Sequence, residues 1–390
     1  MAATPAAANS MTPGQQNALA RQLILANAVD RFQQIFTTTV AASNVGGLVN
    51  VQPRNVGLIR GFMIDIIASV SNSAGGVATL TKWGAANILS GITFTDLQNN
   101  TRVQTQGWHL AAINTARAMK PFGIPFALNA NPPIAYGNNF GEISAPATIA
   151  ASTAGTVTMR YYLPITYGQN DLRGAIYASV VNATMNLALQ INQNTFVAAG
   201  DATLGVYSGS AGAAGTLGGV GNVTVNVYQH YYDQIPESNG QPVLPMQDLS
   251  TIYELKSTSM SGISEGLDFP IPYANFRTFL STLAIYDNGG TLNAGSDVNY
   301  WALQSANFTN IWKVSPQENA MLSLVANGVD WPVGSYYFNH RQRPINTSQF
   351  GNMQLLLNAS DVQVGAQILL GYEDFAIQNT LNAAASLPGG

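Results

Sequence analysis

The sequence contains no cysteine and little charge. Without cysteine there is no disulfide framework and no thiolate metal site, so the fold does not depend on the redox compartment. Lys and Arg number 15 and Asp and Glu 19, which makes 9% charged residues, against about 25% in ordinary soluble domains. Because nucleic-acid affinity comes from Lys and Arg on phosphates, the net charge of −4 argues against direct, sequence-specific nucleic-acid binding.

Long apolar runs are also missing. The longest candidate, residues 57–67, is interrupted by Arg60 and Asp65, and it falls short of the roughly 18 residues of a membrane-spanning helix. The first ten residues have neither the basic region nor the apolar core of a secretory signal. We therefore expect a soluble protein made in a cytoplasm.

Apolar residues and neutral polar residues are abundant. Hydrophobic residues make up 46%, which excludes a disordered chain, and 390 residues exceed the roughly 250–300 that one core holds. Two domains are expected. Neutral polar surfaces can be pressed together without desolvating many ions, so the composition favours extensive protein–protein contact. A β protein from a compositionally biased genome would have the same composition.

The pattern predicts one amphipathic helix over residues 12–36. Thr12 can cap it with Gln15 as the capping-box partner, and Pro13 would occupy the first helical position. Such a helix must dock on its own domain, on a neighbour or on a membrane surface, and with few cations strong attachment to anionic lipid is not expected. Four residues at helical spacing form the apolar stripe: Leu25, Val29, Phe32 and Phe36.

After Thr37 the pattern becomes one of short runs with period two, which predicts an all-β sandwich or barrel. Residues 84–144 and 198–222 are expected to be long polar segments between strands, which at this length are either functional or carry structure of their own. A short helix is expected between Leu172 and Phe196. The predicted strands are Leu58–Val70, Thr156–Pro164, Val223–Asp233, Phe276–Tyr286, Ser335–Phe338, Met353–Leu357 and Ala366–Phe375.

An internal repeat indicates two copies of one β domain, with a seam in the proline-spaced residues 236–245. Four features recur in order at an offset of 217, with spacing that matches within a few residues, and each half closes with a similar triplet. The first copy holds Arg60-Gly-Phe62, Gly75-Gly76, Trp83, Ala86-Asn87-Ile88 and the triplet Tyr231-Tyr232-Asp233; the second holds Arg277-Thr-Phe279, Gly289-Gly290, Trp301, Ala306-Asn307-Phe308 and Tyr372-Glu373-Asp374.

No constellation for catalysis or metal binding emerges. His109, His230 and His340 lack ligand spacing. The G-x-S-x-G match at 262–266 leads into a proline-rich run rather than a helix, so a loop is expected. Residues 287–297 lack the glycine and glutamate of a calcium loop, and residues 215–221 lack a phosphate-loop order.

The remaining candidates are carboxylates and tryptophans. Glu373 and Asp374 are adjacent, and strand alternation sends them to opposite faces. The five tryptophans could form a sugar-binding platform, but Trp83 and Trp301 are equivalent in the repeat, which favours a core role. We expect no enzyme, no catalytic residue, no metal and no cofactor.

Several segments, in one order along almost the whole chain, resemble the major capsid protein of tectiviruses, which are tailless icosahedral phages with a membrane inside the shell. The similarity weakens before Gln15, in 208–221 and after Gln378. The segments are Gly107-Trp-His-Leu110, Asn114-Thr-Ala116, Ser144–Ala150, Asp248-Leu-Ser-Thr251, Tyr286-Asp-Asn-Gly-Gly290, Asn293-Ala-Gly295 and Leu370-Gly-Tyr-Glu373.

The resemblance implies an all-β double jelly roll, two tandem eight-stranded jelly rolls behind an N-terminal helical arm. The implied division is an arm at 1–36, a first jelly roll at 37–241 and a second at 242–390 with a C-terminal tail. It further implies homotrimers of pseudo-hexagonal outline that tile an icosahedral shell around an internal membrane. The implied partners are the chain itself, penton and minor capsid proteins and the vesicle, and the implied location is the virion, after assembly in the host cytoplasm.

By this analogy the four stripe residues, Leu25, Val29, Phe32 and Phe36, would contact the vesicle or adjacent subunits. The alternative that remains open is a jelly-roll carbohydrate- or receptor-binding virion protein, which would need an exposed aromatic platform or a calcium loop.

Overall fold

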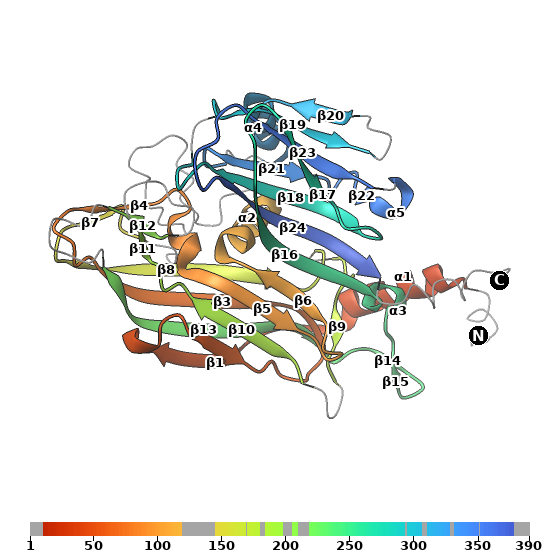
Figure 1. The fold of residues 1–390 in the computed structure, drawn as a ribbon. Helices are drawn as coiled ribbons and strands as arrows, with labels where there is room; N and C mark the ends of the chain where they lie inside the picture. Colours follow the sequence, from red (N-terminus) through yellow and green to blue (C-terminus); the bar gives the residue numbers. More distant parts are fainter. Residues whose placement is uncertain are drawn as a thin grey trace.

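The computed structural model describes residues 11–118, 145–168, 170–179, 184–197, 205–209, 218–292, 295–305, 310–327, 331–350 and 352–377. In this part of the chain, strands build two sandwiches that lie one above the other, with the first half of the sequence below and the second half above in Figure 1. The first half also carries α1 (Pro13–Asn27), which lies at one end of the molecule, on the right of Figure 1.

The first sandwich has two sheets. One has the order β1 (Val29–Val40), β13 (Gly219–Asp233), β3 (Leu58–Ser71), β8 (Ala154–Pro164), and β9 (Ile176–Tyr177) pairs with β3. The facing strands have the order β2 (Leu48–Val51), β10 (Asn186–Ile191), β5 (Leu89–Thr95), β6 (Thr101–Thr105). After β6 the chain enters α2 (Gly107–Ala118).

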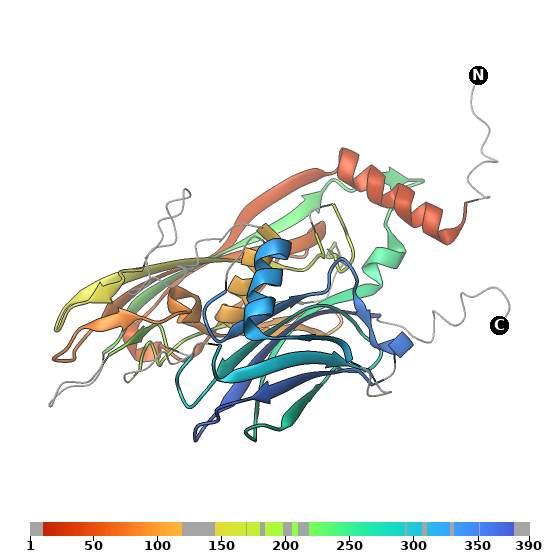
Figure 2. The same cartoon turned by 90° about the horizontal axis from the view of Figure 1, so that it is seen from above.

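The second sandwich repeats this order. One set of strands runs β16 (Thr251–Ser261), β24 (Gln367–Ile377), β18 (Thr278–Asp287), β21 (Ser335–Asn339), and β22 (Ile345–Asn346) pairs with β18. The facing sheet runs β17 (Asp268–Pro272), β23 (Gln354–Ala359), β19 (Val298–Gln304), β20 (Asn310–Val314). After β20 the chain enters α4 (Pro316–Asn327), which lies on the near side of this half in Figure 2.

The two sandwiches are joined by a continuous sheet. Strand β6 of the first half pairs in parallel with β16 of the second half, with Val103 opposite Leu255. Helix α2 lies beside this joint, between the halves (Figure 1). One hydrophobic cluster includes the first-half core, Trp108 and Ile113 of α2, and second-half residues such as Leu283 and Leu369. The halves therefore share a core, and a second cluster fills the upper sandwich alone.

The smaller elements lie at the rims. They are the sheet β11 (Phe196–Val197), β12 (Tyr207–Ser208), β4 (Ala78–Leu80), β7 (Thr148–Ile149), the hairpin β14 (Glu237–Ser238) and β15 (Gln241–Pro242), the 3₁₀ turns η2 (Ala42–Asn44) and η3 (Gly84–Ile88), and the short helices α3 (Met246–Leu249) and α5 (Thr347–Phe350). The hairpin occupies the proline-spaced stretch between the halves.

Each of the seven predicted strands is present, as β3, β8, β13, β18, β21, β23 and β24. Period-two burial explains this success, because β13 buries Val223, Val225 and Val227 while the residues between them face outward. The predicted loop at 262–266 is also confirmed, since it connects β16 to β17.

The predicted helix over 12–36 is wrong beyond Asn27. The N-terminal prediction holds, because Thr12 and Gln15 form the capping box and Pro13 starts the helix. From Val29 the chain is β1, paired along its length with β13. Three β-branched or aromatic residues of the stripe fit a strand equally well, and the cross-strand pairing decides between the two. The predicted arm boundary at residue 36 falls inside β1.

The segment predicted at 84–144 carries structure of its own in its described part, since residues 84–118 hold η3, β5, β6 and α2. Residues 119–144 lie outside the described residues. Another expectation fails. The short helix expected between Leu172 and Phe196 is not found in the described residues of that range, which form β9 and β10. Most of the polar segment expected at 198–222 also lies outside the description.

The repeat is real in strand order, but its sequence offset is not uniform. Phe62 and Phe279 are equivalent, as the offset of 217 predicted, since both occupy the same strand. Trp301, however, does not match Trp83. It pairs with Val314 where β19 meets β20, and the equivalent pair in the first half, where β5 meets β6, is Ile92 with Thr105. Its counterpart is therefore Ile92 and not Trp83. In the same way Tyr372 corresponds to Val227 rather than to Tyr231. Residues 306–309 of the predicted repeat lie outside the description.

Candidate assembly interface

Helix α1 is docked on the body of the protein through one carboxylate. Asp248 of α3 is buried and accepts hydrogen bonds from Arg21 Nε and Nη2, at 2.7 and 2.6 Å, and from Asn17 Nδ2 at 2.9 Å. The side chain of Asn17 in turn accepts from the backbone N–H of Gln247. Ile24 fills a small apolar cluster under the helix. The helix is therefore fixed in orientation by a partly buried ion pair and by apolar packing centred on Ile24.

The four residues predicted for the interface do not form one stripe. Leu25 is half-buried and packs on the cluster around Ile24. Val29 is exposed at the start of β1, and Phe32 is 51% exposed. Phe36 is half-buried and packs against the main core. A bulge between Gln34 and Phe36 resets the alternation, so Phe32 and Phe36 point to different faces of the strand.

Phe32 lies on an aromatic patch on the outer face of the first-half sheet. Its ring stacks on Tyr228 of β13, with centroids 5.3 Å apart and planes within 6°. It also meets His230 edge-on at 6.0 Å. His230 is hydrogen-bonded to the Tyr162 hydroxyl at 2.9 Å and to Asp30 at 2.8 Å. Burial, with Arg60 nearby, lowers the pKa of His230, so His230 is neutral at pH 7. The charged groups next to the patch are Asp30 and Arg60.

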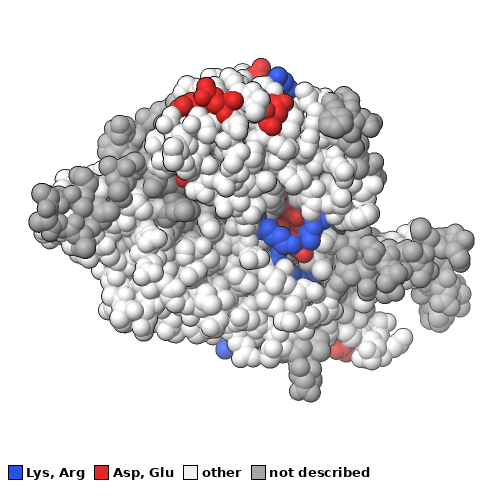
Figure 3. Space-filling view, viewed as in Figure 1, with Lys and Arg blue, Asp and Glu red and all other residues white. Residues whose placement is uncertain are grey.

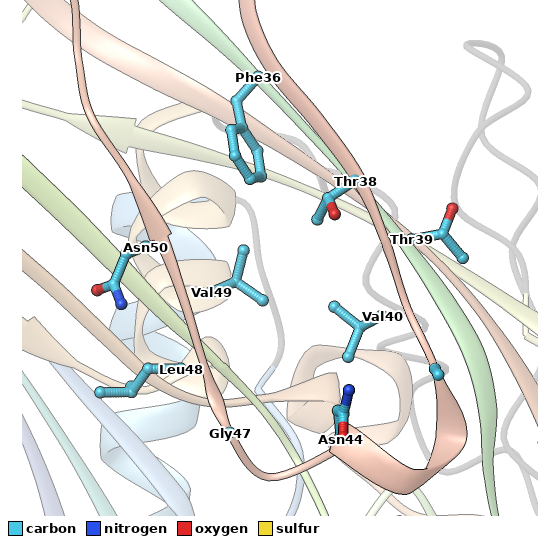
Figure 4. A pocket seen from close by; sticks show the side chains of 10 residues that line it. Phe36, Thr38, Thr39, Val40, Asn44, Gly47, Leu48, Val49 and Asn50 are labelled. Atoms are coloured by element: carbon cyan, nitrogen blue, oxygen red, sulfur yellow. The ribbon is translucent and has the colours of Figure 1, made fainter.

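Phe36 lines an open cavity of 440 Å³ between β1 and β2. In Figure 4 the side chains of Phe36, Val40 and Val49 point into the gap between the two strands, whereas Leu48 and Asn50 point away from it. This cavity has no charged lining residue. It is the open edge of the first sandwich, where the two sheets separate.

A second exposed apolar surface lies at the other end of the molecule, on α4. Its exposed face carries Met321, Leu322, Leu324 and Val325, with Met321 70% and Val325 79% exposed. The buried face carries polar residues instead, Asn319 and Ser323. A surface helix normally buries its apolar face. This inverted pattern leaves an apolar face of α4 uncovered within one chain.

The sequence reading missed α4, although a signal was present. Ser315 and Glu318 form a capping box, because Glu318 Oε2 accepts from the Ser315 N–H at 2.7 Å and Ser315 Oγ accepts from the Glu318 N–H at 3.3 Å. Pro316 is the first helical residue. This is the same start signal that identified α1 correctly.

The buried ionisable groups join the two halves. Glu373 of β24 binds Arg341 Nη2 at 2.6 Å and Arg117 Nη2 of α2 at 3.0 Å, and it accepts from the hydroxyls of Tyr253 and Ser281, each at 2.7 Å. Burial alone would raise the pKa of Glu373, but the two guanidinium groups and these hydrogen bonds hold it at about 2. The carboxylate is therefore charged and structural.

Asp374 points to the opposite face, as strand alternation predicted. It binds Arg277 Nη1 at 2.9 Å, and Arg277 also contacts Glu254. Here burial dominates and raises the pKa of Asp374 to about 6. In Figure 3 the visible surface is mostly uncharged, and acidic and basic residues gather in a hollow between the halves.

The described residues hold no group of three or more His, Asp or Glu side chains placed to bind a metal ion. His109 and His340 are buried, which lowers the pKa of each to about 4. Four of the five tryptophans are buried and Trp312 is half-buried, so the core role predicted for Trp83 and Trp301 is confirmed. Within the described ranges, no helix is long and apolar enough to cross a membrane.

Comparison with solved structures gives the class of fold. The crystal structure of the STIV MCP superposes with a TM-score of 0.62 at 12% identity, covering 92% of this chain and 100% of that one. The atomic structure of Sulfolobus Turreted Icosahedral Virus gives 0.63 at 12%, covering 92% and 94%. PBCV-1 VP54, fitted into a reconstruction of the virophage Sputnik, gives 0.53 at 12%, covering 89% and 94%.

Two tandem sandwiches of one strand order, matched over their length by these structures, define a double jelly roll of the kind found in viral capsid proteins. The sequence comparisons are more specific. Residues 6–235 match the family described as P3 major capsid protein N-terminal, and 250–387 match P3 major capsid protein C-terminal. The major capsid protein P3 of Enterobacteria phage PRD1 is 36% identical over 97% of this chain and 98% of its own length. The chain belongs to the P3 major capsid protein family.

Proposed function

We propose that the protein is the major capsid protein of a membrane-containing icosahedral phage. Three copies form a trimer whose six sandwiches give a near-hexagonal outline, and these trimers tile the shell around the internal membrane. The observation that carries the proposal is the 36% identity to a major capsid protein over 97% of the chain. The function is assembly, and no catalytic role is proposed. The virion shell is its location, reached after assembly in the host cytoplasm.

The partners follow from this role. The chain contacts itself within and between trimers, and it meets penton and minor capsid proteins at the vertices and between facets. The arm, residues 1–36, supplies α1 and the first part of β1. The first jelly roll is assigned to 37–241 and the second to 242–390. The interface residues Leu25, Val29, Phe32 and Phe36 are proposed to contact adjacent subunits or the vesicle, and the exposure of Val29 and Phe32 supports this.

The test is the solution mass of the purified chain, measured by light scattering after size exclusion. We expect a species of three chains that persists on dilution, because obligate interfaces are large and apolar. A monomer of 41.2 kDa at every concentration would contradict the proposal. Glycan-array binding by the same sample is the control for the carbohydrate-binding alternative, which has no exposed tryptophan to support it.

A further inference from the structure

The junction between the two halves of one chain has three parts. Strand β16 extends the sheet of the first half by pairing with β6. Helix α2 covers the face of β16 and β24, with His109 so close to Gly371 that a Cβ on Gly371 would lie 2.2 Å from the imidazole. Arg117 of α2 places its guanidinium 5.0 Å from the ring centroid of Tyr253 on β16. All described side chains of α2 are buried except that of Arg117, which is half-buried.

The helix side of this junction has a counterpart at the far end of the second half. The residue numbers of β20 and α4 exceed those of β6 and α2 by a constant 209, from 101 to 310 and from 107 to 316. Two residues at this spacing bond to equivalent strands: Asn114 Nδ2 donates to the Tyr162 carbonyl at 2.6 Å, and Ser323 Oγ donates to the Tyr337 carbonyl at 3.1 Å. Helix α4 therefore sits on its sandwich as α2 sits on its own.

The sheet side of the junction has a counterpart at the free edge of the first half. Tyr253 of β16 pairs with Phe375 of β24, with rings 5.9 Å apart at 69°. Phe32 of β1 pairs with His230 of β13, with rings 6.0 Å apart at 72°. Phe32 therefore occupies the place of Tyr253. Glu373 lies two residues before Phe375 on β24, and Tyr228 lies two residues before His230 on β13. Tyr228 therefore occupies the place of Glu373.

The residues of the internal junction are buried, whereas their counterparts at the two free surfaces are more exposed. Tyr253 is 1% exposed, whereas Phe32 is 51% exposed. Arg102 and Val103 of β6 are buried, whereas their counterparts on β20 are Ile311, which is exposed, and Trp312, which is half-buried. In the described part of the chain β20 pairs only with β19, and β1 pairs only with β13. The two uncovered surfaces lie at opposite ends of the molecule (Figure 1).

We propose that β20 and α4 of one copy dock on β1 and β13 of a second copy, in the arrangement that β6 and α2 adopt on β16 and β24 within the chain. This inference rests on the proposed function and names the surfaces that would form the trimer seam. The second copy is the fitting partner because the chain itself shows which surface covers this strand and helix. The contact pairs two different surfaces, so it is heterologous, and repeating one junction around six sandwiches closes a ring of three copies.

The chemistry of the seam differs from that of the internal junction. Inside the chain, Arg117 meets Glu373. At the seam the corresponding residues are Ala326 and Tyr228. Ala326 would lie against the ring of Phe32, which stacks on Tyr228, and the second copy would cover Met321 and Val325 of the same helix. The seam therefore lacks a counterpart of the buried Arg117–Glu373 ion pair, whose desolvation between separate molecules would be costly, and it gives the exposed Phe32 a partner.

A disulfide between copies tests this geometry directly, because the chain has no cysteine of its own. The constant difference of 209 makes Glu318 the counterpart of His109, and the difference of 145 between Glu373 and Tyr228 makes Asn226 the counterpart of Gly371. The double variant Glu318→Cys with Asn226→Cys is expected to form a covalent trimer on oxidation. Either single variant is expected to remain unlinked. Glu318→Cys with Glu237→Cys, on the distant β14, is the matched control (Figure 1).

Nonreducing electrophoresis reads the linkage, and light scattering of the unmodified chain reads the mass. Covalent trimers from the first pair but not from the control establish the seam. An unmodified chain that is trimeric while the first pair stays unlinked overturns the proposed seam and leaves the capsid function standing. An unmodified chain that is monomeric overturns both.

Discussion

At the scale of single residues, Phe276 has a strained backbone. It has a φ of +61° in the connection between β17 and β18, and its side chain is 76% exposed. Left-handed backbone costs a residue with a side chain about 1–2 kcal/mol, and no burial of the ring offsets this within the chain. No local sequence pattern predicts this φ, because it is set by how the two flanking strands meet.

Replacing Phe276 with glycine is therefore expected to stabilise the fold. Removing the strain gains about 1–2 kcal/mol, and the greater freedom of glycine in the unfolded chain costs about 0.5–1 kcal/mol. At this chain length the net gain corresponds to a rise in Tm of about 1 °C, measured by scanning calorimetry. Phe276→Ala is the control, since it removes the ring but keeps the strain. A Tm for Phe276→Gly below that of Phe276→Ala would show that the backbone is not strained, because only the cost of glycine's freedom would then remain.

At the scale of elements, the sequence predicted strands better than it predicted the ends of helices. Strands such as β13 bury alternate valines, so their residue pattern alone predicts a strand. The residue pattern does not predict the transition from α1 to β1, because Val29, Phe32 and Phe36 fit a helical stripe and also fit a strand with a bulge. Pairing with β13, almost 200 residues away, decides the outcome.

The candidate site was predicted only in part for a related reason. Phe32 was identified because it is apolar and regularly spaced, and it proved to be exposed. The apolar residues of α4 were not identified, because the helix itself was not predicted although its capping box was present. Residue spacing also does not show which face of a helix is turned outward. Asn319 and Ser323 are the buried ones, and only the packing of α4 on its sandwich reveals this.

Helix α4 provides a test of element packing. Val325→Asp would place a charge in the apolar seam, where an unpaired buried charge is costly, so the dissociation constant of the trimer is expected to rise at least about 100-fold. The monomer should keep its far-UV circular dichroism, since Val325 is 79% exposed within one chain. Val364→Asp is the control, because Val364 is fully exposed in the turn before β24. Equal trimer dissociation in both variants would remove α4 from the interface.

At the scale of the whole molecule, two adjacent carboxylates of β24 differ in role, because Glu373 joins the two halves whereas Asp374 binds only residues of the second half. Glu373 connects Arg117 of the first half to Arg341 of the second, and its pKa is held at about 2. Asp374, one residue later on the other face, has a pKa raised to about 6 by burial. The first carboxylate therefore stabilises the fold when ionised, whereas the second favours the protonated form.

Opposite signs of pH dependence follow from these shifts. The contribution of Glu373 is present above its unfolded pKa of about 4.5 and is lost as the pH falls through about 2. The contribution of Asp374 has the other sign, because its folded pKa is raised: it is present below about 3.8 and is lost as the pH rises through about 6. Acid should therefore weaken the joint between the halves through Glu373 and not through its neighbour.

Glu373→Gln is expected to destabilise the protein strongly at pH 7. It leaves Arg117 and Arg341 buried without a carboxylate, and breaking a buried ion pair in this way costs about 3–5 kcal/mol. Asp374→Asn is the matched control one position away, and it should cost less than half as much, because Arg277 keeps Glu254 as a partner. Denaturant unfolding at pH 7 and at pH 3 measures both effects. The loss in Glu373→Gln should shrink at the lower pH, and an equal loss in the two variants would show that Glu373 does not join the halves.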